Sequence, residues 1–310
     1  MAFDFSLVSA PFRMQPGLRR VAPGAAQLTP ALPGSRHLRE KRAVLAGHPG
    51  QALVALPSYD AGEALAAIAG EAASLQPAAF TYRNQGDCRA DRLGWALCDG
   101  QPAGDGDPAI GLLLRALAPT DRATALACLA FEEDFAVLDG ATATVPWLAV
   151  CLPSRWAPET KVGLRFAAVH APVADNALLV SASERLALLV TGDERWERFV
   201  WTFAAEPRLD QHPARAAASG WPADADGDAL AARTSLRSER QTFIPIPGRQ
   251  RAVFTIHVES RRLDEAVDST DAAGRLHDAL ASMSPAVLAY RGLDAVRDRL
   301  LGWLARRASA

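Results

Sequence analysis

The sequence has little cysteine, no long hydrophobic run and almost no net charge, and each absence argues against a class of protein. The cysteines, Cys88, Cys98, Cys128 and Cys151, form neither a Cys-x-x-Cys pair nor a zinc-finger spacing with a histidine, so a structural zinc site or an iron–sulfur cluster on this chain is not expected. No stretch approaches the length of a membrane span. A formal net charge of −2 gives no global electrostatic preference for nucleic acid or for an anionic membrane.

Several well-known signatures are also missing. The chain contains no Gly-x-Gly-x-x-Gly and no P-loop, and it has neither Gly-x-Ser-x-Gly nor His-Glu-x-x-His. Its first residues lack the basic region and apolar run of a signal peptide, so we expect a reducing, cytoplasmic setting with free thiols. With 310 residues, of which 49% are apolar, the chain is long enough to bury a sizeable core in one large domain or two smaller ones.

Hydrophobic periodicity predicts helices mixed with antiparallel strands. Helices are expected at 37–46, 60–75, 109–117, 120–129, 176–190 and 285–305, and strands at 51–56, 131–138, 145–152, 231–246 and 251–259. Residues 1–36 are rich in proline and glycine and predict an extended arm, whereas 82–107 are polar and predict a long loop. Because strands and helices do not alternate regularly, the pattern favours an α+β fold with helices around an antiparallel sheet over a doubly wound parallel sheet.

Residues 151–173 stand out because an apolar strand end leads into a cationic segment that finishes at a histidine. Arg155 and Lys161 supply two of the cations, and small apolar residues surround His170, with Pro172 halting any helix just after it. A neutral imidazole in such a rigid apolar setting suits a metal or a heme iron. A core histidine with a single hydrogen bond is the alternative, and this stretch alone leaves it open.

A second cluster, Arg237-Ser238-Glu239-Arg240-Gln241-Thr242, lies in a predicted hairpin that is otherwise apolar. On a strand, Arg237, Glu239 and Gln241 point one way, while Ser238, Arg240 and Thr242 point the other. Two interpretations remain open. The charges form a buried Arg–Glu network that locks the hairpin, or the guanidinium groups bind carboxylates such as heme propionates with bidentate geometry.

Taken in order, these segments resemble the heme-dependent oxidative N-demethylase α-subunit family. The resemblance spans nearly the whole chain and rests on Pro11-Phe12-Arg13-Met14, Gly17-Leu18-Arg19, Ser154-Arg155-Trp156, Lys161-Val162-Gly163, Val169-His170-Ala171-Pro172-Val173, the 237–242 cluster, Phe254-Thr255-Ile256 and Ala289-Tyr290-Arg291-Gly292-Leu293. It implies a single PAS-like domain over 1–310, with an N-terminal extended arm and a C-terminal helix, that binds heme b. The implied reaction is oxidative removal of a methyl group from a small secondary amine such as dimethylamine, giving methylamine and formaldehyde.

The resemblance also implies a partner and roles for individual residues. Electrons are expected to pass to or from a separate protein that carries flavin and a [2Fe–2S] cluster, because this chain shows neither module. His170 is the expected proximal iron ligand. Arg237 and Arg240 are the expected propionate contacts, with Arg155 and Lys161 behind them.

Two further residues are candidates for the catalytic pocket. Glu239 is expected to orient the arginines, with attraction of an ammonium substrate as the alternative, and His257 is expected to line the same cavity from a strand face. The remaining histidines, His37, His48, His212 and His277, lie in polar sequence and are expected to be solvated. Two other functions stay open: a heme-binding PAS-like sensor or electron-transfer module without turnover, and a heme-free interaction protein.

Overall fold

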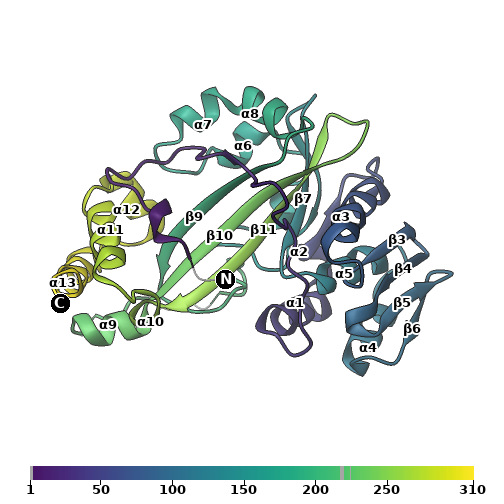
Figure 1. The fold of residues 1–310 in the computed structure, drawn as a ribbon, viewed down its shortest axis with the longest axis horizontal. Coiled ribbons are helices and arrows are strands. Elements are labelled where there is room, and N and C mark those ends of the chain that lie inside the picture. The colour runs from purple at the N-terminus through teal and green to yellow at the C-terminus, as the bar shows by residue number, and fades with distance from the viewer. Residues whose placement is uncertain (1–2, 217–219, 224) are drawn as a thin grey trace.

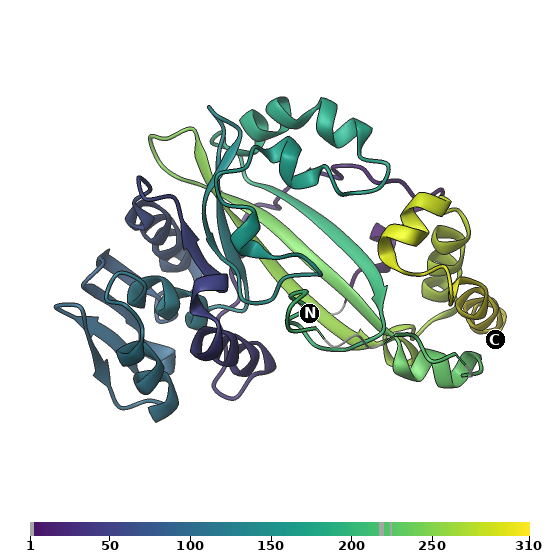
Figure 2. The ribbon, with the colours of Figure 1, turned by 180° about the vertical axis from the view of Figure 1, so that it is seen from behind.

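A seven-stranded antiparallel sheet forms the centre of the computed structural model, which describes residues 3–216, 220–223 and 225–310 (Figure 1). In spatial order the strands are β1 (Arg19–Arg20), β9 (Trp196–Ala204), β10 (Ser235–Pro245), β11 (Arg251–Arg262), β7 (Asp134–Asp139), β8 (Thr144–Ala149) and β2 (Leu53–Ala55). The reverse view shows helices gathered at both ends of the long strands (Figure 2). The combination of helices with an antiparallel sheet confirms the α+β class.

The hairpin of β10 and β11 is the longest pairing in the sheet, and its turn lies where the sequence predicts it. Gly248 in that turn has a φ of +69°, a left-handed conformation that glycine adopts without a steric penalty. The predicted start at residue 231 is wrong, because Gly227–Arg233 form helix α9, whose first turn is capped by the Asp226 carboxylate. The strand therefore begins at Ser235.

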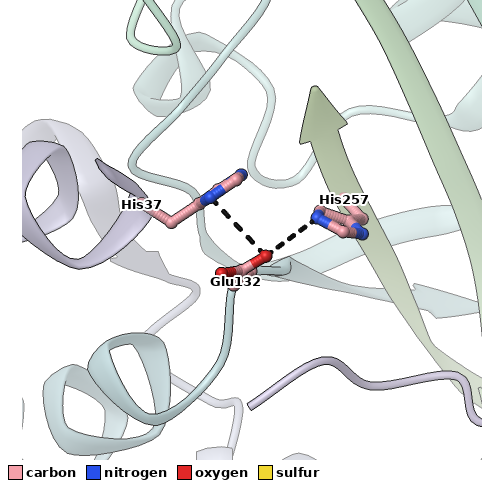
Figure 3. Close-up of side chains that lie close together, drawn as sticks. All are labelled: His37, Glu132 and His257. Carbon is pink, nitrogen blue, oxygen red and sulfur yellow. Dashed lines mark ion pairs between the residues drawn. The ribbon is translucent and has the colours of Figure 1, made fainter. Parts of the chain in front are cut away.

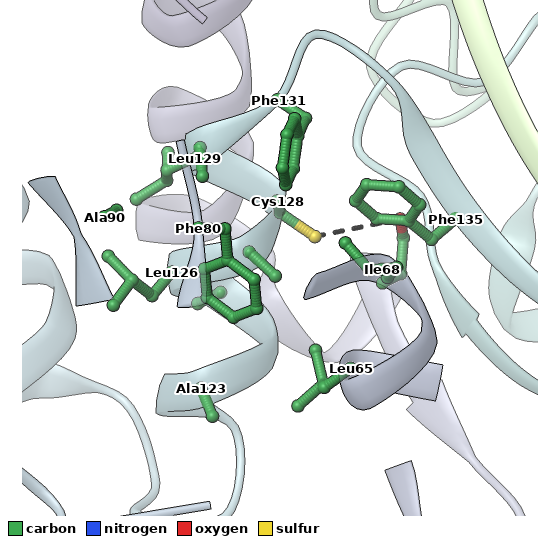
Figure 4. Close-up of a cluster of buried hydrophobic side chains, with 14 of the residues drawn as sticks. Leu65, Ile68, Phe80, Ala90, Ala123, Leu126, Cys128, Leu129, Phe131 and Phe135 are labelled. Carbon is green, nitrogen blue, oxygen red and sulfur yellow. Dashed lines mark hydrogen bonds between the residues drawn. The ribbon is translucent and has the colours of Figure 1, made fainter. Parts of the chain in front are cut away.

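Helices α1 (Arg36–Gly47), α2 (Pro49–Ala52), α3 (Ala61–Leu75) and α5 (Arg122–Ala130) lie at the β7–β8 end of the sheet, and α4 (Pro108–Ala116) packs on α1 and α5. Asp60 caps α3, as its position at the start of the expected helix indicates, and Ser35 caps α1; each accepts a hydrogen bond from a backbone N–H of the first turn. Every residue of α5 is buried, and Figure 4 shows Leu126, Cys128 and Leu129 in one cluster with residues of α3, Phe80, Phe131 and Phe135. This end of the molecule therefore holds the largest hydrophobic core.

The long loop predicted at 82–107 is wrong. The segment forms a second antiparallel sheet of β3 (Thr81–Asn84), β4 (Asp87–Ala90), β5 (Trp95–Cys98) and β6 (Gln101–Gly104). Each strand is short, and only alternate residues such as Cys88, Ala90, Trp95 and Leu97 face inward. Because the outward residues are polar and the turns are tight, the composition resembles that of a loop. The inward residues join the core of α3 and α5, so both sheets share one hydrophobic core.

The far end of β10 and β11 is covered by a separate group of helices. These are α9, α10 (Leu263–Ala266), α11 (Thr270–Ala281), α12 (Pro285–Arg291) and α13 (Arg297–Ala308). The single helix expected over 285–305 is two helices, since Gly292 takes a left-handed φ of +65° and ends α12. Their apolar faces pack on Trp201, Phe203 and Leu236 of the sheet.

Three short helices, α6 (Phe166–His170), α7 (Ala177–Ser181) and α8 (Ser183–Val190), lie over the sheet near β7 and β8. The helix expected at 176–190 is thus interrupted at Ala182. Single 3₁₀ turns occur at Phe5–Leu7, Asp91–Leu93 and Pro158–Thr160. Among the described residues, no helix combines the length and the apolar character needed to cross a membrane.

A fully buried ion pair connects α1 to the central sheet. Lys41 Nζ lies 3.1 Å from Asp134 Oδ1 and donates to the backbone carbonyls of Cys128, Phe131 and Glu133. Burial lowers the pKa of Lys41, but Asp134, together with Cys128 and Cys151, outweighs this effect, so the pKa is raised and the lysine stays charged. The second oxygen of Asp134 accepts from the backbone N–H of Leu152 at 2.6 Å. The pair therefore fixes α1, β7 and the segment after β8 in one arrangement.

We expect Lys41→Met to lower the free energy of unfolding by about 3–5 kcal/mol, because it leaves a buried carboxylate without its partner. Urea unfolding of the purified protein measures the change. Lys161→Met, at a half-exposed lysine, is the matched control and should change stability by about 0.5 kcal/mol or less. Equal unfolding midpoints for the Lys41 variant and the unchanged protein would contradict the importance of the pair.

Candidate functional site

The charged side chains of the central hairpin divide between the two faces of the sheet. Arg237 and Glu239 project from the face covered by α6–α8, where their register partners are Thr202 and Val200 of β9. Arg240, one residue further along β10, projects from the opposite face and is paired across the hairpin with His257. The N-terminal arm crosses that opposite face (Figure 1). The predicted alternation of the 237–242 cluster is thereby confirmed.

Arg237 is buried and holds β10 to two loops. Its Nε donates to Ser154 Oγ at 2.8 Å, and its other N–H groups donate to the carbonyls of Leu152, Arg208 and Leu209 at 3.2, 3.1 and 2.8 Å. Burial lowers its pKa to about 10, with Glu239 opposing that effect, so the guanidinium remains charged at neutral pH. The segments after β8 and after β9 are consequently fixed against the middle of the sheet.

Glu239 lies beside Arg237 in the same network and is half-exposed. The hydroxyl of Ser154 donates to its Oε1, and Gln241 Nε2 donates to its Oε2 at 2.6 Å. On the neighbouring strand, Arg198 is the register partner of Gln241. Burial lowers the pKa of the Arg198 guanidinium, and the Glu239 carboxylate partly opposes that lowering. Glu239 thus connects a buried arginine with one that faces α6.

His170 is the last residue of α6, before the stop at Pro172. Its Nδ1 donates to the carbonyl of Phe166 at 2.9 Å, and the two rings lie 4.2 Å apart. This hydrogen bond leaves the lone pair on Nε2. Burial lowers the pKa of His170, the Phe166 hydrogen bond opposes this, and the cations Arg198 and Lys161 lower it further. The imidazole is therefore neutral near pH 7, as a metal ligand must be.

Two predicted cations lie in the segment that leads to α6. Arg155 has a left-handed φ of +61°, and its backbone N–H donates to the carbonyl of Gln211 at 3.1 Å. A side chain added at Gly292 would lie 3.4 Å from Arg155 Nη1, so the 154–156 and 289–293 motifs meet in space. Lys161 follows a 3₁₀ turn and is close enough to His170 to affect its pKa.

The sheet face between β9 and α6 is apolar and carries an excess of positive charge. Arg198, Val200 and Thr202 are only half-buried although they lie on a sheet face, and they are accompanied by the partly buried, apolar Val169 and Phe166 of α6. Arg198 and Arg237 lie on this face with Glu239, Lys161 lies near His170, and Arg155 follows Ser154 in the chain. Such a surface suits an apolar ligand that bears acidic groups.

Sequence analysis does not single out Arg198. The segment 196–203 contains several aromatic residues, and it is not among the strands predicted from the sequence. Period-two alternation along Trp196, Arg198 and Val200 is the signal that places the arginine on this face. Its alignment with Gln241 becomes visible only when the pairing of β9 with β10 is known.

The other predicted site residues lie on the opposite face. Arg240 forms an ion pair with Glu197 at 2.9 Å and donates to the carbonyl of Ala26 at 2.7 Å. His257 lies 3.2 Å from Glu132 and, as the register partner of Arg240, faces away from the network of Glu239. His170, Lys161, Arg155, Arg237 and Glu239 therefore gather around one face, while Arg240 and His257 gather on the other.

Two histidines that were expected to be solvated are buried instead. His37 and His212 are 7% and 2% exposed, because His37 bonds the carbonyl of Val258 and His212 contacts the Glu159 carboxylate. Both partners are distant in sequence, so the polar local composition gave the wrong expectation. His48 is exposed as expected, and His277 is half-exposed.

One comparison with known proteins bears on this site. The class that the fold and the face define is an α+β protein with a helix-borne histidine beside a cationic sheet face. A model of the family described as haem-dependent oxidative N-demethylase, alpha subunit-like, matches residues 35–301. The chain belongs to this family, and the resemblance drawn from the motifs is confirmed. The family name describes a heme-dependent demethylase-like protein and one subunit of a larger assembly.

Arg237→Gln tests whether the network around this face depends on the buried guanidinium. We expect the free energy of unfolding to fall by about 3 kcal/mol, because several acceptors and Glu239 lose their partner. Urea unfolding of the heme-free protein gives the value. The exposed Arg155→Gln serves as the control and should change stability by about 0.5 kcal/mol or less. Indistinguishable curves for the two variants would show that Arg237 does not hold the loops.

Proposed function

We propose that this chain is the heme-binding subunit of an enzyme that oxidatively removes a methyl group from a small secondary amine. One observation carries the proposal: a neutral imidazole, His170, presents its Nε2 lone pair near Arg198, a half-buried cation whose buried Nε has no hydrogen-bond partner among the described residues. Membership of the demethylase α-subunit-like family supplies the reaction class. The proposal includes a single PAS-like domain, heme b as the cofactor and a cytoplasmic setting.

Unsatisfied polar atoms test whether these residues fit a heme. Arg198 Nε and Trp196 Nε1 are both buried on this face, and neither has a hydrogen-bond partner among the described residues. Buried donors of this kind are rare in folded proteins and cost about 1–3 kcal/mol each. Two propionates would provide acceptors and would also balance the excess of cations. The residues therefore fit the group.

The proposed heme contacts follow from the placement of the side chains. His170 would hold the iron, Arg198, Lys161 and Arg155 would bind the propionates, and apolar residues of α6 would contact the macrocycle. Arg237 already donates to protein acceptors, so we assign it to positioning Ser154 and Glu239. A heme held at His170 lies on the face opposite to Arg240 and His257.

Bound heme would supply the redox-active iron that the oxidation of an amine requires. The surrounding residues would orient the amine and shield it from water. Glu239 offers a carboxylate oxygen that would accept a hydrogen bond from the amine N–H, and apolar side chains of α6 would exclude water. Electrons would be exchanged with a separate subunit that carries flavin and a [2Fe–2S] cluster.

His170→Ala should abolish stable heme retention, since it removes the proposed iron ligand. The measurement is the heme-to-protein ratio and the Soret band after heme reconstitution, and added imidazole should restore binding in His170→Gly. His48→Ala, at an exposed histidine, is the control and should retain full heme content. A Soret band of normal position and intensity in the His170→Ala protein would overturn the assignment.

Arg198→Gln should weaken heme affinity roughly 10- to 100-fold, because a charge-assisted hydrogen bond contributes about 1.5–3 kcal/mol. Heme transfer to apomyoglobin measures the loss. Arg240→Gln is the matched control on the opposite face, and its affinity should equal that of the unchanged protein. If Arg240→Gln weakened heme affinity and Arg198→Gln did not, the propionates would lie on the Arg240 face instead.

A further inference from the structure

Three side chains from distant parts of the chain converge on the face opposite to His170. His37 comes from α1, Glu132 precedes β7, and His257 lies on β11 (Figure 3). Glu132 Oε2 is 3.6 Å from His37 Nδ1 and 3.2 Å from His257 Nε2, and the three ligand atoms lie within 4.8 Å of one another. Among the described residues, no other group of three or more His, Cys, Asp or Glu side chains brings its ligand atoms this close together.

The ring nitrogens that face away from the centre each have an oxygen nearby, within hydrogen-bond distance for His37 and at ion-pair distance for His257. His37 Nε2 donates to the carbonyl of Val258 at 2.7 Å, which leaves the lone pair on Nδ1, toward Glu132. His257 Nδ1 lies 3.6 Å from the Glu133 carboxylate, whose other oxygen accepts from the backbone N–H of Thr29 at 2.8 Å. A carbonyl or carboxylate behind each imidazole is the arrangement that fixes metal-binding histidines.

An unsatisfied nitrogen points into the same centre. His257 is 8% exposed, and its Nε2 makes no hydrogen bond to any described residue. The contact with Glu132 at 3.2 Å is an ion pair by distance, but it lacks the alignment of a hydrogen bond. A buried polar atom without a hydrogen-bond partner destabilises the fold unless another group or a ligand binds it.

Carboxylates outnumber cations around the centre. Glu132, Glu133 and Glu259 face His257, with Glu259 at 3.6 Å from Nε2. The cations near them are already paired: Lys41 of α1 with Asp134, and Arg240 of β10 with Glu197. Burial lowers the pKa of His37 and keeps that ring neutral, whereas the carboxylates outweigh burial and raise the pKa of His257. A metal ion must therefore displace a proton from His257.

We propose that His37 Nδ1, His257 Nε2 and Glu132 Oε2 bind a divalent first-row transition metal such as Zn²⁺. Imidazole ligands select such a metal over Ca²⁺ or Mg²⁺, which take oxygen ligands. Ligand atoms at about 2.1 Å from a tetrahedral zinc lie about 3.4 Å apart, which the separations of 3.2 and 3.6 Å bracket. Water or the Glu259 carboxylate completes the coordination.

The metal would connect α1 to β11 and to the residue that precedes β7, a strand that already pairs with β11. Glu259 also lines a cavity of about 130 Å³ on the same face, so the proposed centre adjoins a cavity. The site is separate from the proposed heme face, and its existence does not depend on the proposed function. Sequence spacing gives no sign of it, because the ligands come from residues 37, 132 and 257.

The test is equilibrium dialysis of chelator-stripped full-length protein against Zn²⁺ at neutral pH, with heme content measured in parallel. We expect one tightly bound zinc per chain, an increase in the thermal unfolding midpoint on zinc addition, and Co²⁺ substitution that gives visible d–d bands. Glu132→Gln preserves the shape of the side chain and should weaken zinc binding by about a hundredfold or more, while Glu133→Gln should weaken it about 10- to 100-fold. Affinity should fall as pH drops, since His257 is then protonated.

His212→Gln is the matched control, because His212 is also buried against a glutamate but belongs to no three-ligand group among the described residues. It should bind zinc like the unchanged protein. Far-ultraviolet circular dichroism establishes that each variant is folded before its affinity is compared. Retention of no zinc by the folded, unchanged protein, or equal zinc affinity in the Glu132→Gln variant, would overturn the proposal.

Discussion

The burial of Arg237 is the constraint on which the site depends. A guanidinium cannot be neutralised in the interior at ordinary pH, so each of its N–H groups needs an acceptor. The acceptors come from the segments after β8 and after β9, and those segments are therefore held at fixed positions against β10. Ser154 then links the same guanidinium to Glu239. The chain that runs on from Ser154 carries Lys161 and His170, so their approach to β9 starts from this anchor.

The alternation of side chains along β10 separates two kinds of chemistry on one sheet. On one face, cations exceed carboxylates around a neutral histidine, which favours a ligand with acidic groups. On the other face, carboxylates exceed unpaired cations around His37 and His257, which favours a metal cation. Arg240 and Glu239 are neighbours in sequence but face opposite ways, and this places the sheet as a barrier between the two centres. Distinct electrostatic environments within a few residues of one strand follow directly from the strand geometry.

Much of the fold was predictable because local physics determined it. The cap of α3 at Asp60, the turn at Gly248 and the two faces of the 237–242 cluster all follow from the sequence. The β3–β6 sheet was missed because its strands expose every second residue to solvent and so have a loop-like composition. The break at Gly292 was missed because the apolar stripe continues through it.

The functional residues were predictable only in part. His170 and its cations lie in one segment, so their grouping can be inferred from sequence, and the structure adds the tautomer and the neighbouring Arg198. His37 and Glu132 could not have been grouped with His257, because only the packing of α1 against the edge of β11 brings them together. The same packing buries His37, which the polar sequence around it did not indicate.

The central claim is that a heme is held on the α6 face of the sheet by His170. A crystal structure of the heme-reconstituted protein tests it most directly, because iron and propionates are both located in one experiment. The account predicts iron bonded to His170 Nε2 and propionates in contact with Arg198 and Lys161. Iron bonded to any other residue, or a heme on the face that carries Arg240, would contradict it.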